Sequence, residues 1–388
     1  MSGELVDRVR QRLATLGGAV TPNLVAQAVR AEAGGVFGDA DLLATLRELT
    51  QEFVGAGPLD PLLRDPATTD VLVTAPDQVW VDGPRGLRRT AVEFRDEDAV
   101  RRLAQRLAAS AGRRLDDAQP FVDGWLPGIG AGGQVRLHAV LPPIAPAGTC
   151  VSLRVLRPAV HDLAELGALG TIDATSAELL TAVVAARLAF LVTGGTGSGK
   201  TSLLAALLGC VPPTERVVCV EDAGELAPDH PQFVRLVARP PNVEGVGEVT
   251  LRDLVRQALR MRPDRIVVGE VRGAEVCELL AALNTGHDGG ASTLHANSPA
   301  EVPARLAALA ALGGLDQAAL HSQLAAAVRV VLHMRRDRVG SRRLAEIAVV
   351  EPHGPEVAIR TAWRHGHGWA EGRALLTRLL ADREVGLP

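Results

Sequence analysis

The hydrophobic positions of the chain change their spacing along its length. Before residue 55 they recur three and four residues apart, as in Leu5, Val9, Leu13 and Leu16, which predicts helices. We expect one helix near 4–16, a second after Pro22 and a third over 39–53. The first 54 residues are therefore predicted to form an N-terminal helical segment.

Between Gly55 and Arg157, short segments alternate apolar and polar residues, which predicts strands. One helical pattern, over 96–111, interrupts them. The strand candidates are 71–74, 78–82, 87–94, 134–141 and 150–156. We therefore predict a small α+β domain over 55–157.

After Arg157 and Pro158 the strand candidates become uniformly apolar and alternate with helical stretches. The strands are expected at 189–193, 217–221, 233–237, 265–269, 291–295 and 328–333, and the helices at 200–208, 251–261, 274–283 and 299–311. This alternation is typical of a mostly parallel sheet with helices on both faces. Two last segments, 344–350 and 356–362, predict an antiparallel addition. We expect a linker over 158–175 and an α/β domain over 176–388.

Composition favours a folded protein and argues against nucleic-acid binding. Hydrophobic residues make up 47% of the chain and charged residues 22%, as in ordinary globular proteins. The net charge is −4 and aromatic residues are 3% of the chain. Nucleic-acid-binding surfaces are usually basic and often aromatic. We therefore expect no stable nucleic-acid binding.

Several features predict a cytoplasmic location. Charges interrupt the apolar positions of the N-terminus, unlike those of a secretory signal. The longest apolar stretch, Leu179 to Val192, is shorter than a bilayer span and contains Arg187. The cysteines lie far apart and form no CxxC pair, which gives no indication of a disulfide framework or zinc cluster: Cys150, Cys210, Cys219 and Cys277. Any membrane contact is expected to be peripheral.

A glycine-rich segment after the apolar strand at 189–193 carries the strongest chemical signal. It reads Gly194, Gly195, Thr196, Gly197, Ser198, Gly199, Lys200 and Thr201, and a helix follows from Ser202. This is a P-loop in its required strand and helix context. Backbone N–H groups would cradle phosphates, Lys200 would reach the β and γ oxygens, and Thr201 would bind Mg²⁺. Lys200 is the only lysine among 41 basic residues, and we expect it on an exposed loop.

Acidic residues follow two of the later strand candidates. Glu221 and Asp222 end one strand, and Glu270 ends another after Gly269, where many P-loop proteins have aspartate. ATP hydrolysis needs a carboxylate on the metal side and a group that activates water. We interpret Glu221 and Glu270 as this pair, whereas Asp222 is equally consistent with a cap on the following turn.

Histidines and arginines supply further candidates. His287 and His295 lie among small residues, and His295 ends a strand, where a histidine could sense the γ-phosphate. Zinc binding is an alternative, but the spacing matches no common site. Arginines cluster near Glu270 and near the domain junction: Arg256, Arg260, Arg262, Arg265 and Arg272, and Arg136, Arg154 and Arg157. Most are expected to be solvated or structural, but Arg136 and Arg154 could stabilise charge during phosphoryl transfer.

Together, four ordered stretches resemble the type II/type IV secretion ATPase superfamily. They are 194–201 as Walker A, 220–226 as the Asp box, 261–272 as Walker B and 285–297 as the His box. Segments 69–73, 78–81, 135–143 and 151–154 look most like the Tad pilus-assembly branch, whereas 128–133 departs from it. The resemblance implies a RecA-like ATPase domain after a PAS-like α+β domain.

The resemblance also implies the activity and its setting. ATP and Mg²⁺ would be the cofactors, Glu221 the water-activating base, and Glu270 the metal-side carboxylate. Six copies would form a ring at the inner face of the cell membrane, working with polytopic inner-membrane platform proteins of a pilus, secretion or conjugation system. Two alternatives stay open, a RecA-like nucleic-acid translocase and a nucleotide-binding regulatory protein with little turnover.

Overall fold

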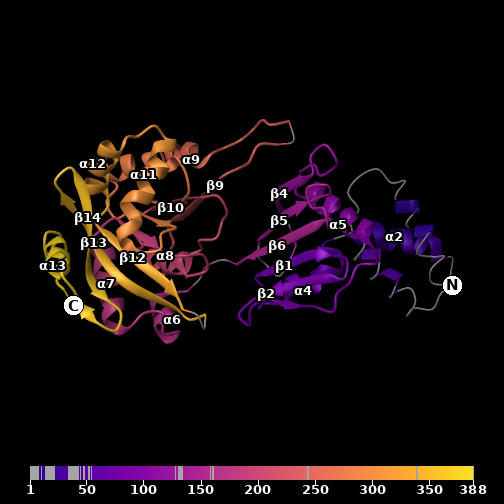
Figure 1. Cartoon of the computed structure of the whole chain (residues 1–388), viewed down its shortest axis with the longest axis horizontal. Coiled ribbons are helices and arrows are strands. Elements are labelled where there is room, and N and C mark those ends of the chain that lie inside the picture. The colour runs from indigo at the N-terminus through magenta and orange to yellow at the C-terminus, as the bar shows by residue number, and fades with distance from the viewer. Residues whose placement is uncertain are drawn as a thin grey trace. The chain divides into compact units, whose positions relative to one another are not determined.

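The computed structural model describes residues 55–387 except 127, 130–133, 158, 160, 243 and 338–339, together with part of 8–53. The chain forms two compact units, Met1–Arg157 and Pro158–Pro388 (Figure 1). Each unit has its own buried core. Helix α2 (Pro22–Ala33) packs Val25 and Val29 into a small N-terminal core. The helices expected at 4–16 and 39–53 lie largely outside the described residues.

The first unit contains a six-stranded antiparallel sheet in the order β3-β2-β1-β6-β5-β4. Its strands are β1 (Asp70–Ala75), β2 (Gln78–Asp82), β3 (Arg88–Arg89), β4 (Phe121–Leu126), β5 (Gln134–Val140) and β6 (Cys150–Leu156); its helices are η1 (Gly57–Leu59), α4 (Asp60–Arg64) and α5 (Glu97–Ser110). Alternate residues of β5 are buried and exposed, as the sequence pattern predicts. One face of the sheet therefore belongs to a core and the other carries polar side chains.

Two details of this sheet differ from the sequence prediction. The strand expected over 87–94 is reduced to β3, in which Arg88 pairs with Val81 and Arg89 with Trp80 of β2. Strand β4 was not predicted, because Asp123 and Gly124 interrupt its apolar pattern. It is an edge strand paired only with β5, and edge strands tolerate such residues.

The second unit contains a nine-stranded sheet in the order β15-β14-β13-β12-β7-β11-β10-β8-β9. Strands β12 to β9 in this order are parallel neighbours, and β13 to β15 form the antiparallel addition. The strands are β7 (Phe190–Thr193), β8 (Val217–Glu221), β9 (Phe233–Val237), β10 (Arg265–Val271), β11 (Ala291–Leu294), β12 (Val330–Arg336), β13 (Arg342–His353), β14 (Glu356–Arg364) and β15 (Gly368–Trp369). The predicted α/β class, with a mostly parallel RecA-like sheet, is confirmed.

Helices cover both faces of this sheet. They are α6 (Leu163–Ala168), α7 (Ala174–Ala185), α8 (Lys200–Gly209), α9 (Leu251–Ala258), α10 (Glu275–Leu283), η2 (Pro299–Glu301), α11 (Val302–Leu312), α12 (Gln317–Ala327) and α13 (Arg373–Ala381). Phe190 and Val192 of β7 belong to one core cluster, whereas Ala189 and Leu191 belong to the other. The central strand is therefore buried on both sides, which explains its uninterrupted apolar sequence.

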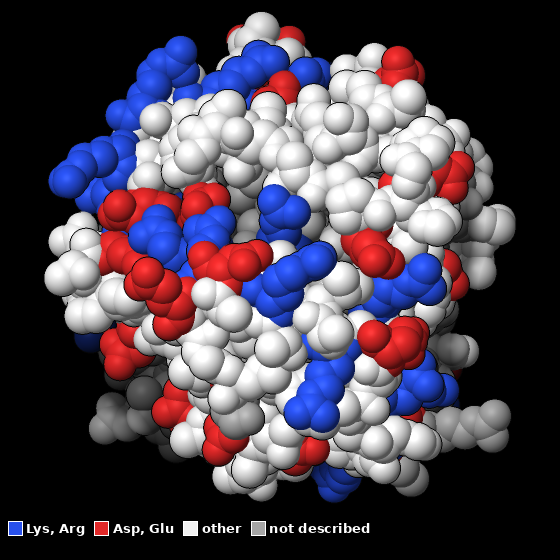
Figure 2. Space-filling view, turned by 90° about the vertical axis from the view of Figure 1, so that its left-hand side faces the viewer, with Lys and Arg blue, Asp and Glu red and all other residues white. Residues whose placement is uncertain are grey.

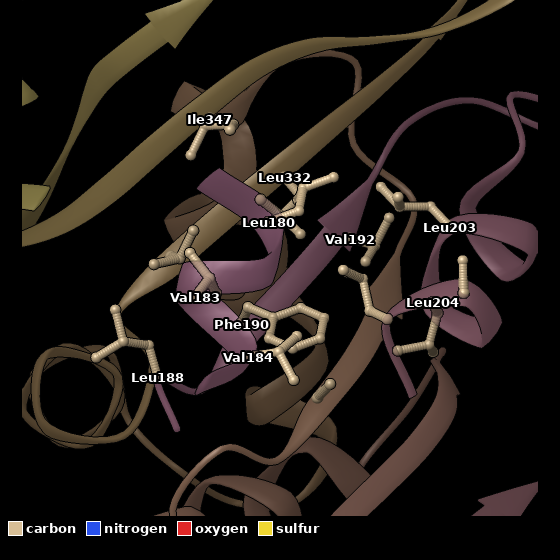
Figure 3. Close-up of a cluster of buried hydrophobic side chains, with 14 of the residues drawn as sticks. Leu180, Val183, Val184, Leu188, Phe190, Val192, Leu203, Leu204, Leu332 and Ile347 are labelled. Carbon is tan, nitrogen blue, oxygen red and sulfur yellow. The ribbon is translucent and has the colours of Figure 1, made fainter. Parts of the chain in front are cut away.

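The cluster containing Phe190 joins β7 to the helices that flank the P-loop. In Figure 3, Phe190 and Val192 lie among side chains of α7, such as Leu180 and Val183, and Leu203 of α8. This packing fixes the start of α8 against the end of β7. Buried side chains of β7 and α8 thereby hold the two ends of the P-loop in place.

The segment expected to be a linker, 158–175, is structured where it is described. Asp162 caps α6 by accepting a hydrogen bond from the backbone N–H of Glu165 at 2.7 Å. Leu166 and Ile172 are buried in the core of the second unit. Because α6 is only six residues long, its apolar pattern is too short to be read as a helix. No helix among the described residues is long and apolar enough to cross a bilayer.

Candidate active site

The P-loop connects β7 to α8 and lies against the backbone of β12. Gly194 has φ of 147°, and a Cβ there would lie 2.3 Å from the carbonyl oxygen of Met334. Gly199 precedes α8 with φ of 96°, a conformation that disfavours other residues. Glycine is therefore required at Gly194 for close approach of β12 and at Gly199 for the turn into the helix. Thr201 and Ser202 lie half-buried in the first turn of α8.

Lys200 itself is enclosed, although Gly195, Thr196 and Gly197 in the middle of the loop are exposed, as expected. Its residue is 8% exposed, and Nζ donates hydrogen bonds of 3.1 Å to the carbonyl oxygens of Gly194 and Gly195. Burial lowers the pKa of Lys200, while the negative charge of Glu270 acts to raise it. The ammonium is thus held within a cradle of backbone groups, where a compact cation fits and a guanidinium does not.

His295 lies between Lys200 and Glu270. Its Nε2 is 3.4 Å from Lys200 Nζ and 2.8 Å from Glu270 Oε1. Arg272 Nε donates a 2.6 Å hydrogen bond to the other oxygen of Glu270. Burial lowers the pKa of His295, and the charge of Lys200 lowers it further. Three residues that are far apart in the sequence therefore meet at one place: Lys200 at the start of α8, Glu270 near the end of β10 and His295 directly after β11.

Glu221 is a buried carboxyl group with one unsatisfied oxygen. The residue is 4% exposed, and Oε1 accepts hydrogen bonds from the backbone N–H groups of Glu225 (3.1 Å) and Leu226 (3.0 Å). Oε2 is buried without a hydrogen-bond partner among the described residues. Burial raises the pKa of Glu221 to about 7, although the two backbone hydrogen bonds act to lower it. A carboxyl group that titrates near neutral pH can act as a general base.

Gly269 makes room for Glu221. A Cβ at Gly269 would lie 2.7 Å from Cγ of Glu221, well inside contact distance. The glycine that makes this Walker B segment atypical is therefore explained by the neighbouring strand β8, whose glutamate side chain passes over it. Thr293 Oγ1 donates a 2.8 Å hydrogen bond to the carbonyl oxygen of Gly269 and fixes the position of this backbone.

One acidic residue was missed by the sequence analysis. Glu225 is half-buried, and its charge acts to raise the pKa of Lys200, as the charge of Glu270 does. Asp222, in contrast, is exposed. The sequence carries a signal for Glu225, because it is the third acidic residue in the short segment 221–225.

Two further sequence candidates, Arg136 and Arg154, form ion pairs within the first unit. Arg136 forms a bidentate ion pair with Asp123, at 2.8 and 2.6 Å, and Arg154 Nε lies 2.8 Å from Asp70. Both arginines lie on the exposed face of the first unit's sheet, opposite each other on β5 and β6. Within that unit they form ion pairs, which is the structural role that the sequence analysis left open.

His287 and Arg265 hold backbone in the second unit. His287 Nδ1 lies 3.0 Å from the carbonyl oxygen of Ala282. Arg265 is 1% exposed, with Nε 2.7 Å from Glu215 and Nη2 3.0 Å from the carbonyl oxygen of Val184. These contacts give both residues a structural role.

The residues present fit a nucleotide with Mg²⁺. Among the described residues, no group of three or more His, Cys, Asp or Glu side chains could hold a metal ion. Mg²⁺ in nucleotide sites takes most of its ligands from water and phosphate, so it needs only one or two protein oxygens. Thr201 and Glu270 are candidates for these, and the unsatisfied Oε2 of buried Glu221 provides an acceptor for a water molecule.

Taken together, a mostly parallel sheet, a P-loop after its central strand and glutamates at the ends of β8 and β10 define a P-loop ATPase with a RecA-like domain. The chain belongs to the type II/IV secretion system protein family, whose model matches residues 52–384. Both the secretion superfamily and the enzyme class expected from the sequence are confirmed.

Individual relatives agree with this family. A putative conjugal transfer protein of Mycobacterium tuberculosis H37Rv is 67% identical over 349 residues, covering 90% of this chain and 99% of that protein. The type IV secretion system protein PtlH of Bordetella pertussis is 33% identical, covering 74% and 91%. The solved structure of the ATPase DotB of Yersinia pseudotuberculosis has a similar fold, with a TM-score of 0.54 at 16% identity over 80% of each chain.

Proposed function

We propose that the chain is a Mg²⁺-dependent ATPase that powers transport or pilus assembly by a secretion-type machine. The contact between Lys200, His295 and Glu270 at the mouth of the P-loop carries this proposal. Through His295, Lys200 is connected to Glu270 on β10. In the sheet, β10 is separated from β7 only by β11. Such a link could report the presence of the γ-phosphate to strands β10 and β11.

In the proposed reaction a water oxygen attacks the γ-phosphorus, the bond to the β–γ bridging oxygen breaks, and ADP leaves with that electron pair. Backbone N–H groups of the P-loop and Lys200 bind the phosphates. Glu221 accepts the proton of the attacking water, a role supported by its pKa near 7 and its unsatisfied buried oxygen. Mg²⁺, held by Thr201 and Glu270, would neutralise phosphate charge.

Arg136 and Arg154 are proposed to assist this reaction from the first unit. Both side chains are more than two-fifths exposed, so they are accessible despite their ion pairs. An arginine that reaches the γ-phosphate stabilises the charge that develops in the transition state. Each guanidinium would leave its carboxylate and pair with a phosphate instead, so that it would keep an ionic partner.

The proposed assembly is a homohexamer that acts on the cytoplasmic side of a membrane, with polytopic inner-membrane platform proteins as partners. The relative that is 67% identical is named for conjugal transfer, and PtlH is named for type IV secretion. Segments such as 69–73 and 135–143 support the Tad branch by resemblance. The proposal therefore includes both pilus assembly and conjugation-type transport as possible uses of the same motor.

A nucleic-acid translocase is the main alternative. On the face of the second unit drawn in Figure 2, basic and acidic side chains are interspersed, unlike a uniformly basic nucleic-acid surface. The test is phosphate release from ATP with Mg²⁺, measured alone, with DNA, and with vesicles of acidic lipid. We expect EDTA to abolish release and acidic vesicles to raise it. If DNA but not acidic vesicles raises phosphate release, the translocase is favoured. If no phosphate is released under any of these conditions, the regulatory nucleotide-binding protein is favoured.

A further inference from the structure

The hairpin formed by β12 and β13 carries arginines next to the P-loop. Adding a Cβ to Gly197 would place it 3.4 Å from Nη1 of Arg336. A Cβ on Gly199 would lie 3.4 Å from Cδ of Arg342 and 3.3 Å from Cε of Met334. Two glycines of the phosphate-binding loop thus have arginine side chains of the hairpin at van der Waals distance.

The two arginines share one face of the hairpin. Arg336 on β12 is paired with Arg342 on β13, and Met334 is paired with Leu344. Because side chains alternate along a strand, Met334 and Arg336 point to the same side, toward the loop. Arg335 points to the opposite side. Buried Met334 and Leu344 therefore hold the hairpin against the loop, and Arg336 and Arg342 extend from this anchor toward solvent.

Within the described part of the chain, neither Arg336 nor Arg342 has an ion pair or a side-chain hydrogen bond. The neighbouring Arg343, in contrast, pairs with Asp337 at 2.9 Å. Two guanidinium groups without an ion pair among the described residues thus lie beside the same short loop that encloses the ammonium of Lys200. An anion bound at this loop would be attracted by all three positive charges. Arginine also matches phosphate oxygens with a planar fork of donors.

We propose that Arg336 and Arg342 form a second phosphate-binding element that holds the phosphate chain of the nucleotide from the hairpin side. This inference rests on the proposed function and extends it, because it adds residues outside the four sequence boxes. Their contribution is to affinity for ATP and ADP alike, since both nucleotides share the phosphates bound in the loop. Loss of either arginine is therefore expected to weaken the binding of both nucleotides.

The test compares Arg336→Ala and Arg342→Ala with the matched control Arg335→Ala, which removes a neighbouring arginine from the opposite face. Dissociation constants are measured for ATP, ADP and inorganic tripolyphosphate by competition with a fluorescent ADP. We expect each hairpin variant to bind all three ligands about tenfold more weakly, equivalent to about 1.4 kcal/mol. Arg335→Ala should stay within about twofold of wild type. Since the three side chains are exposed, the unfolding midpoints should remain near that of wild type.

The ligand series separates the possible failures. Unchanged affinities in both hairpin variants would overturn the inference, and so would weaker ATP binding with unchanged tripolyphosphate binding, which places the contact on the base or ribose. An equal loss in Arg335→Ala would show that only the overall charge of the hairpin matters and would also overturn it. If wild type binds none of the three ligands, the proposed function itself fails.

Discussion

At the residue scale, the position of the Glu221 side chain depends on glycine at position 269. The glutamate of β8 occupies space that a side chain on β10 would otherwise fill, with 2.7 Å between Cγ and the position of an added Cβ. The sequence predicted that Glu221 and Glu270 act together, and it showed that Gly269 is atypical. It did not give the reason, because steric exclusion between neighbouring strands depends on their register.

Replacing Gly269 with alanine should displace the Glu221 carboxylate. We expect Gly269→Ala to lower the maximal rate of ATP hydrolysis at least tenfold, about 1.4 kcal/mol of barrier, with nucleotide affinity within about threefold of wild type. Steady-state kinetics and nucleotide titration check this. Gly209→Ala is the control, since an added Cβ there meets only an ordinary contact at 3.9 Å. Normal turnover in Gly269→Ala would show that the position of Glu221 is unimportant.

The raised pKa of Glu221 should make stability depend on pH. The folded protein holds the proton more tightly than the unfolded chain, so this group's contribution to stability falls as the pH rises from 4.5 to about 7. Glu221→Gln removes that cost, and we expect it to stabilise the nucleotide-free protein by up to about 3 kcal/mol at pH 8 and hardly at pH 4.5. Chemical denaturation at the two pH values measures the difference. An equal effect at both values would contradict the raised pKa.

At the scale of elements, the closest packing in the site is between the P-loop and β12. Gly194 combines a positive φ with an approach of 2.3 Å between an added Cβ and the Met334 carbonyl oxygen. We expect Gly194→Ala to destabilise the nucleotide-free protein by roughly 2 kcal/mol and to weaken nucleotide binding. The matched control is Gly195→Ala, because no atom lies within 4 Å of its added Cβ. Thermal unfolding of the two variants should differ clearly, and equal midpoints would refute the packing argument.

Elements with a clear period were predictable from the sequence, and others were not. Strands β8 and β9 begin and end where expected, because four of the five residues in each are apolar. Helices α7 and α12 were missed because their alanine-rich sequences show little contrast between faces. The meeting of Lys200, His295 and Glu270 depends on strand order β7-β11-β10, which no local pattern specifies.

At the scale of the whole molecule, the question is whether the first unit takes part in hydrolysis. We expect Arg154→Ala to lower the maximal rate at least tenfold, about 1.4 kcal/mol of barrier, with ATP affinity nearly unchanged. The control is Asp70→Asn, which removes the charge of the partner that lies 2.8 Å from Arg154. Near-normal turnover in Asp70→Asn would support a role on the nucleotide. Equal loss of rate and of melting temperature in both variants would show that the ion pair is structural.

Phosphate release from Mg²⁺-ATP, measured together with nucleotide binding on the same samples, tests the central claim most directly. Wild type should bind and hydrolyse ATP, and at about a hundred times its dissociation constant the nucleotide should add roughly 2.7 kcal/mol of stability. Glu221→Gln should still bind and be stabilised, but release no phosphate. Lys200→Ala should lose hydrolysis while remaining folded. Turnover at the wild-type rate in Lys200→Ala would contradict the assignment of this site as the ATPase centre.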